Sequence, residues 1–363
     1  MDLRPYGLNL TWTPETEIRT IDSTLLSPGH IEDKRVFVIA NKRFTAKEKI
    51  NQGTFGVIYK VESRGKLYAC KVLRFMGTAM DFQAFLHEVL IHILLLQASL
   101  PEKNGPYVPY LYHVAYDKAL NKTYIITEWM DKTLRDEIVH HSKSENDRRL
   151  PTYLSQLAHI LGFFGETLRF NHRDLHSANI MVGKGRVVII DFGYSCLLWE
   201  GLEVKGPSSV YDVARNPCYK EDRDLPFLLM ELYMYYDAFI SDKLRKLFHA
   251  SLIARVDPQG ICDLGVLCPE HGVATLEDRY EFLNKPASKI PGGVPHYVEH
   301  RLRAFRPDPL RKQFLPAWRP FSSEVPKKSK HRRLTLRKNR MARTFSEIPE
   351  DMVLEKGVVG PLK

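Results

Sequence analysis

A glycine-containing turn has the residue types needed to hold a phosphate group. It occupies Ile50-Asn51-Gln52-Gly53-Thr54-Phe55-Gly56-Val57-Ile58, between two strand patterns. Glycine lets the backbone approach a ligand closely, and consecutive backbone N–H groups in a turn can bind an anion. The same glycines also suit a plain hairpin, so the turn alone leaves both explanations open.

Two charged residues follow the turn at positions where they could act together. Lys71 ends an apolar strand pattern fifteen residues after Gly56, and Glu88 borders the apolar stripe of the next predicted helix. A carboxylate at that place could hold the lysine in position. Each residue also has an ordinary explanation, because lysine stems often pack along strand ends and single glutamates are usually solvated helix charges.

A polar loop and a tripeptide form the most specific pattern in the sequence. The loop is His172-Arg173-Asp174-Leu175-His176-Ser177-Ala178-Asn179, and Asp191-Phe192-Gly193 begins twelve residues after Asn179. Both follow the glycine turn and Lys71 in order. Coincidence is a poor explanation for all four features together.

Side-chain periodicity predicts the elements that position these residues. Apolar residues at helical spacing after Asp81 predict a helix, a largely helical stretch covers 153–170, and Asp224 precedes a helix at 227–236 that is apolar on nearly every face. Strand patterns occupy residues 44–50, 57–61, 67–73, 124–127, 180–182 and 187–190. Strands first and helices second predict an α+β protein.

Composition bounds the class of protein. With 363 residues, 44% of them hydrophobic, the chain can form one large or two ordinary domains, which excludes collagen, coiled coil and disorder throughout. The longest aliphatic-rich run, 90–100, is interrupted by polar residues, and the N-terminus has no signal-peptide pattern. The sequence therefore predicts no membrane association.

The five cysteines predict a reducing compartment. They are odd in number and scattered, so we expect no disulfide framework. Cys262, Cys268 and His271 could form part of a zinc site, although their spacing matches no common finger and a fourth ligand is not evident. The expected location is intracellular, either cytoplasmic or nuclear.

The positive charge is concentrated near the C-terminus. Residues 301–343 contain 15 Lys and Arg against two Asp and Glu, a net charge of +13, whereas the whole chain carries +10. The remaining 320 residues therefore carry −3. This basic segment is either a solvated, mostly disordered extension or a nuclear-import or nonspecific polyanion and nucleic-acid contact.

The ordered motifs of residues 44–240 resemble those of eukaryotic-type protein kinases, with a weaker extension to about 285. The resemblance implies a bilobal kinase-like fold. Its N-lobe, 44–128, would hold a five-stranded antiparallel sheet and one helix, and its C-lobe, 129–285, would be mainly helical and shortened. Residues 1–43 would then be an N-terminal extension, and 286–363 a basic, Pro-rich, largely disordered tail.

The resemblance also implies the site. It would bind ATP with Mg²⁺, or Mn²⁺ as an alternative, and would act on a protein substrate. By resemblance, Lys71 contacts the α- and β-phosphates and pairs with Glu88, Asp174 accepts the proton of the substrate hydroxyl beside His176, and Asn179 and Asp191 hold the metal. The implied nucleotide contacts are Ile50, Asn51, Gln52, Gly53, Thr54, Phe55, Gly56, Ile58, Ala69, Lys71, Thr127, Glu128 and Met130. Asp224 resembles the helix-start aspartate that braces the catalytic loop.

Three departures from the family pattern bear on activity. Asn51 replaces the first glycine of the turn, His176 stands where Ser/Thr kinases usually carry lysine, and the Ala-Pro-Glu signature is missing, with only Asn216-Pro217-Cys218 in its place. Such diverged, trimmed kinases are common in large DNA viruses. The features favour that origin, in which case the protein would act in the host cell or be associated with the virion.

Four functions remain open from the sequence. The leading one is an ATP-dependent protein kinase, with serine and threonine favoured over tyrosine. A pseudokinase or scaffold would keep the fold without transfer, but retention of the motif residues argues against it. A small-molecule kinase of related fold is disfavoured by the complete His-Arg-Asp-Leu and Asp-Phe-Gly motifs. The fourth is a nucleic-acid-binding protein that acts through the basic tail.

Overall fold

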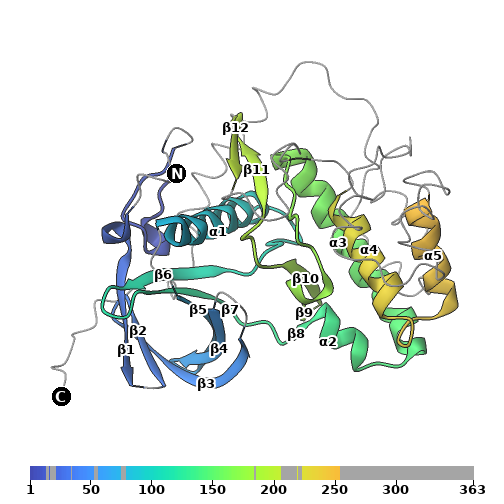
Figure 1. Cartoon of the computed structure of the whole chain (residues 1–363), viewed down its shortest axis with the longest axis horizontal. Helices are drawn as coiled ribbons and strands as arrows, with labels where there is room; N and C mark the ends of the chain where they lie inside the picture. The colour runs from blue at the N-terminus through green and yellow to red at the C-terminus, as the bar shows by residue number, and fades with distance from the viewer. Residues whose placement is uncertain are drawn as a thin grey trace. The chain divides into compact units, whose positions relative to one another are not determined.

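The chain divides into two compact units in a computed structural model that describes residues 1–13, 16, 22–33, 35–52, 56–74, 79–183, 185–205, 219 and 223–253 (Figure 1). Of these, residues 1–130 and 199–205 belong to the first unit. Residues 131–198, 219 and 223–253 belong to the second.

A closed barrel of seven strands forms the first unit, in the order β1-β2-β3-β4-β5-β7-β6. Neighbouring strands are antiparallel except β1 and β6, which pair in parallel. Apolar side chains fill the interior, among them Phe37, Phe44 and Tyr124. The strands are β1 (Ser27–Asp33), β2 (Val36–Ile39), β3 (Lys42–Gln52), β4 (Gly56–Ser63), β5 (Lys66–Arg74), β6 (Leu111–Asp117) and β7 (Lys122–Glu128).

The barrel corrects the expected five-stranded antiparallel sheet. Two further strands, β1 and β2, come from the segment expected to be an N-terminal extension, and one strand pair is parallel. The β1 sequence, Ser-Pro-Gly-His-Ile-Glu-Asp, has no alternating apolar pattern. It is a strand because β2 and β6 supply hydrogen-bonding partners on both sides. Residues 1–43 are therefore part of the first unit.

One long helix, α1 (Ala79–Ser99), packs against the barrel at β6 (Figure 1). Its side chains from Phe85 onward are almost all buried, on every face of the helix. By length and composition, Phe82–Ser99 could cross a membrane, but 78% of that stretch is buried inside the protein. A helix with apolar residues all round needs cover on more than one side.

The described part of the second unit is mainly helical, with α2 (Leu134–Val139), α3 (Lys143–Leu168), α4 (Asp224–Tyr235) and α5 (Asp242–Ile253). Helix α4 packs against α3 and α5 (Figure 1), and its apolar residues are buried as its sequence predicts. Helix α3 begins ten residues before the predicted stretch, because Ser142 and Glu145 form a reciprocal N-terminal capping box. Buried Pro151 lies within the helix.

A small sheet completes the second unit, in the order β10-β9-β8. Its strands are β8 (Lys132–Thr133), β9 (Ile180–Gly183) and β10 (Arg186–Ile189), so the predicted strand patterns at 180–182 and 187–190 are confirmed and pair as a hairpin. Strands β11 (Cys196–Trp199) and β12 (Leu202–Lys205) form a separate two-stranded sheet. Short 3-10 helices are η1 (Arg4–Tyr6), η3 (Ser23–Leu25) and η4 (Ser177–Asn179).

Several sequence predictions lie outside the described residues. They concern the glycine-turn tip at 53–55, the segment that replaces Ala-Pro-Glu, the C-lobe after residue 253, the zinc alternative at Cys262, Cys268 and His271, and the tail at 286–363.

Candidate active site

Lys71 and Glu88 meet in the first unit. Lys71 lies on β5 between Ile58 of β4 and Ile125 of β7, and its Nζ donates a 2.7 Å hydrogen bond to Glu88 Oε1 on α1. The side chains are 24% and 14% exposed, so water screens this ion pair only in part. The structure thus brings together two residues that are 17 positions apart.

Two buried titratable side chains of the first unit are neutral near pH 7. Burial raises the pKa of the Cys70 thiol next to Lys71, so the thiol stays protonated inside the barrel. The pKa of His92, one helical turn beyond Glu88, is lowered to about 4, mainly by burial. The hydrogen bond to the Pro109 carbonyl opposes this shift, and the nearby charge of Lys71 adds to it. Near neutral pH, His92 therefore adds no positive charge beside the pair.

The predicted adenine-binding residues lie on β5 and β7. Ala69 and Thr127 are direct partners in the sheet. The N–H of Glu128 donates to the Tyr110 carbonyl at 2.8 Å, so only the Glu128 carbonyl could serve adenine from that residue. Met130 is buried and is the last residue of this part of the first unit.

The described ends of the glycine turn are strand residues. Asn51 and Gln52 pair with Ile58 and Val57. The φ of Asn51 is not positive, so asparagine in place of glycine causes no backbone strain there. Gly56 is sterically required, because a Cβ there would lie 2.4 Å from the carbonyl oxygen of Val72 on β5. The turn is therefore fixed on β5 at its C-terminal end, and Ile50 is exposed.

Asp224 holds the catalytic loop in the second unit. This buried carboxylate at the start of α4 accepts hydrogen bonds from Asn171 Nδ2 at 3.1 Å, His172 N at 2.8 Å and Arg173 N at 2.9 Å. Arg173 has a positive φ of 69°. Three bonds to one charged group stabilise this strained backbone. The role implied for Asp224 agrees with this geometry.

The loop places Asp174 beside two of the predicted residues. Asn179 Nδ2 donates to the Asp174 carbonyl oxygen at 3.0 Å. His176 Nε2 lies 3.8 Å from Asp174 Oδ2, close enough for an ion pair when the imidazole is protonated. Asp174 and His176 are about one-third exposed. A substrate hydroxyl and solvent can therefore reach both side chains.

The Asp191-Phe192-Gly193 motif follows β10 and is tied to the same loop. Ile190 N donates to the Asn179 carbonyl at 3.0 Å, and the next residue, Asp191, is exposed with a φ of 67°. Phe192 is buried against the His172 ring, with 5.7 Å between ring centroids. His172 Nε2 also hydrogen-bonds the Ile190 carbonyl at 2.8 Å.

This donor set fits a magnesium ion. The Asn179 amide nitrogen is turned to the Asp174 carbonyl, which leaves the amide oxygen as the ligand atom, and Asp191 supplies a carboxylate. Oxygen ligands of this kind, completed by phosphates and water, suit Mg²⁺. No cluster of three or more His, Cys, Asp and Glu that could hold a metal occurs among the described residues.

A second anchor of the catalytic loop had no signal in the sequence. Glu231 on α4 accepts two hydrogen bonds from Ser177, one from the backbone N and one from Oγ, each 2.7 Å long. Ser177 Oγ also lies 2.9 Å from the Tyr236 hydroxyl. Glu231 is 54 residues from Ser177. The only signal in the sequence is a charged residue within a strongly apolar helix, and this signal does not indicate a partner.

The segment after the tripeptide is fixed to the start of the loop. Asn171 and Cys196 exchange two backbone hydrogen bonds of 2.9 Å, and Ser195 Oγ donates to the His172 carbonyl at 3.1 Å. Cys196 takes part in a disulfide, which the scattered cysteines of the sequence did not indicate. Cys70 is a free, buried cysteine.

The comparison with known families fits this geometry. Residues 44–212 match the family model described as the protein kinase domain. This part of the chain is similar to protein kinase domains. The match begins at the residue where the sequence places the domain start, and it includes Lys71, Glu88, the catalytic loop and Asp191.

Curated relatives are similar to part of the chain. Serine/threonine-protein kinase greatwall from Ailuropoda melanoleuca and from Canis lupus familiaris are each 25% identical to it over 155 residues. The Gallus gallus protein of the same name is 24% identical over 155 residues. The alignments cover 42% of this chain and 16–17% of the relatives, so the chain spans about a sixth of their length.

Proposed function

We propose that this chain is an active protein kinase that transfers the γ-phosphoryl group of ATP to serine or threonine hydroxyls of proteins. The observation that carries the proposal is the formed ion pair between Lys71 and Glu88, 2.7 Å long and mostly shielded from solvent. Protein kinases need this pair in place for transfer. A scaffold that only kept the fold would have no need of it.

The residues of the first unit would bind the nucleotide. Lys71 would contact the α- and β-phosphates, and Glu88 would restrict its ammonium group to the position that reaches them. Backbone N–H groups of the glycine turn would cover the phosphates, with Gly56 fixing the turn on β5. The adenine ring would be held beside Ala69 and Thr127.

The residues of the second unit would carry out the transfer. Asp174 would orient the substrate hydroxyl and accept its proton as the oxygen forms a bond to the γ-phosphorus. The bond from that phosphorus to the β,γ-bridging oxygen breaks, and ADP leaves. Asp224 and Glu231 would hold the loop still during this step, through five hydrogen bonds to its backbone and side chains.

Asn179 and Asp191 would hold the divalent ion, which when bound neutralises charge on the β- and γ-phosphate oxygens. The preference for serine and threonine is supported by the names of the greatwall relatives. His176, in place of lysine, would support the transferred group with a charge only when the imidazole is protonated.

The test is transfer of labelled phosphate from ATP to a peptide library, followed by phosphoamino-acid analysis. Asp174→Asn should abolish transfer while the melting temperature stays that of the wild type. Asp237→Asn removes an exposed carboxylate of the second unit and should leave transfer unchanged. Nucleotide binding by wild type without transfer, in Mg²⁺ or Mn²⁺, would favour a scaffold. Phosphotyrosine as the only product would overturn the serine/threonine assignment.

A further inference from the structure

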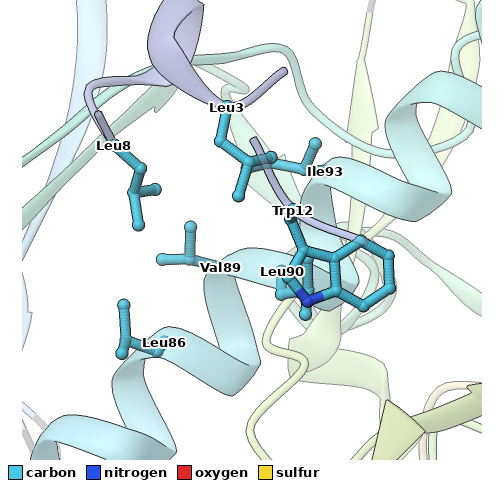
Figure 2. Close-up of a pocket in the computed structure, with 7 residues that line it drawn as sticks. All are labelled: Leu3, Leu8, Trp12, Leu86, Val89, Leu90 and Ile93. Atoms are coloured by element: carbon cyan, nitrogen blue, oxygen red, sulfur yellow. The ribbon is translucent and has the colours of Figure 1, made fainter. Parts of the chain in front are cut away.

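The first twelve residues cover the outer face of α1. Leu3, Leu8 and Trp12 line one apolar pocket together with four residues of that helix (Figure 2). The three N-terminal side chains are each only 2% exposed. The helix residues are Leu86, Val89, Leu90 and Ile93, all at most 4% exposed. These contacts supply the second apolar cover that a helix buried on every face requires.

The segment is a closed loop and not a loose strand. Met1 N donates to the Trp12 carbonyl at 2.6 Å, and Trp12 N donates to the Met1 carbonyl at 2.8 Å. Leu3 N donates to the Leu10 carbonyl at 3.0 Å within the loop. Residues 1–12, called the N-terminal brace below, therefore present Leu3, Leu8 and Trp12 as one preformed surface.

The brace is seated on the barrel as well as on α1. Gly7 has a φ of 91°, and a Cβ there would lie 2.3 Å from the Val114 carbonyl oxygen on β6, so glycine is required. Asn9 N donates to the Leu25 carbonyl at 2.7 Å, and Ser27 N to the Gly7 carbonyl at 2.8 Å. The brace thus links α1 to the barrel that carries Lys71.

Glu88 lies on the same part of α1 as the braced residues. It is one residue before Val89 and two after Leu86, and its carboxylate bonds to Lys71. A helix moves as a rigid body, so a shift that uncovers Leu86 and Val89 also moves Glu88 away from Lys71. The brace lies outside the matched kinase domain, which begins at residue 44.

We propose that the N-terminal brace holds α1 where Glu88 reaches Lys71, which makes Leu3, Leu8 and Trp12 positioning residues for transfer. The effect on transfer rests on the proposed kinase function, whereas the effect on the ion pair does not. A kinase built in this way carries its own cover for the helix, and its ion pair forms without a second protein.

Two readouts in the full-length chain test the proposal. The first is the rate at which a small amine-acylating reagent labels Lys71, measured by mass spectrometry, with Lys47 as internal reference. Lys47 pairs with Glu62 on the surface at 3.1 Å, far from the brace in the sequence. Trp12→Ala and Leu3→Ala should each raise Lys71 labelling about threefold or more, toward the rate of Glu88→Gln, because the ion pair opens more often.

The second readout is kcat/KM for a peptide in two backgrounds. Trp12→Ala should lower it about tenfold in otherwise wild-type protein and hardly at all in Glu88→Gln, because both changes remove the same support. A merely structural role would give the same factor in both backgrounds.

Two matched variants separate positioning from loss of folding. Arg4→Ala removes an exposed side chain of the brace and should change neither readout. Trp12 Nε1 is buried with no hydrogen-bond partner in the described structure, so Trp12→Phe keeps the apolar contact without orphaning an acceptor and should stay close to wild type. It also provides a folded comparison if Trp12→Ala does not fold, and Leu3→Ala then carries the test.

The outcomes distinguish the two proposals. Wild-type Lys71 labelling in folded Trp12→Ala and Leu3→Ala overturns the brace, whatever the transferase activity. Faster labelling in a protein that transfers no phosphate supports the brace and rejects the kinase function. Equal loss of kcat/KM in both backgrounds rejects the positioning role.

Discussion

The ion pair between Lys71 and Glu88 gives the sharpest quantitative prediction. Replacing Glu88 with glutamine keeps a side chain of the same shape and removes its charge. The pair is 2.7 Å long, and its side chains are 24% and 14% exposed. A hydrogen bond to a charged group at such a site contributes about 1.5–3 kcal/mol. If transfer needs the pair, Glu88→Gln lowers kcat/KM by about 10- to 150-fold.

The double mutant tests whether the two residues act as a unit. Lys71→Met should cost more than Glu88→Gln, because it also removes the contact to phosphate. Once Lys71 is methionine, Glu88→Gln should change kcat/KM by less than about threefold, since nothing remains for the carboxylate to position. The four proteins are compared at saturating ATP with one peptide, and their melting temperatures are recorded.

A surface ion pair of the same unit provides the control. Lys47 and Glu62 are 3.1 Å apart with side chains 46% and 37% exposed, and exposed pairs contribute little. Glu62→Gln should therefore leave kcat/KM unchanged. The reasoning is refuted if Glu88→Gln lowers kcat/KM by one factor in both the wild-type and the Lys71→Met backgrounds.

Three further predictions concern other parts of the fold. Glu231→Gln should lower kcat about tenfold with little change in the KM for ATP, because it loosens the catalytic loop; unchanged kcat would contradict this anchoring role. Gly56→Ala should destabilise the first unit by about 1–3 kcal/mol in urea unfolding, because its Cβ would clash with the Val72 carbonyl, and a stable variant would show that β4 can move away. Burial lowers the pKa of both His92 and His113 to about 4, so the unfolded chain binds more protons than the folded one between about pH 6.5 and 4. The free energy of unfolding should therefore decrease by up to about 3 kcal/mol per histidine as the pH is lowered through that window, as measured by tryptophan fluorescence in urea. Replacing both residues, His92→Leu with His113→Leu, should reduce this pH dependence.

Much of the site was determined by the sequence itself. The loop around Asp174, the tripeptide at Asp191 and Lys71 were identified from residue types and order, although Lys71 lies inside β5 and not at the end of the strand. Strands β3, β4, β5 and β7 were predicted within two residues of their observed ends, because alternating side chains record which face of a strand is buried. Helix α4 was found for a related reason, since its uniformly apolar sequence requires a central position.

The tertiary structure decided what depends on contacts between distant segments. Strand β1 has no strand pattern of its own and exists because β2 and β6 pair with it. The bonds from Ser177 to Glu231 span 54 residues, and neither residue has a local signal for the other. The cover of α1 by residues 1–12 likewise depends on which apolar faces meet once the barrel has closed. Periodicity and capping act within a few residues, so they can be recognised in the sequence, whereas burial partners are chosen only when the whole chain has folded.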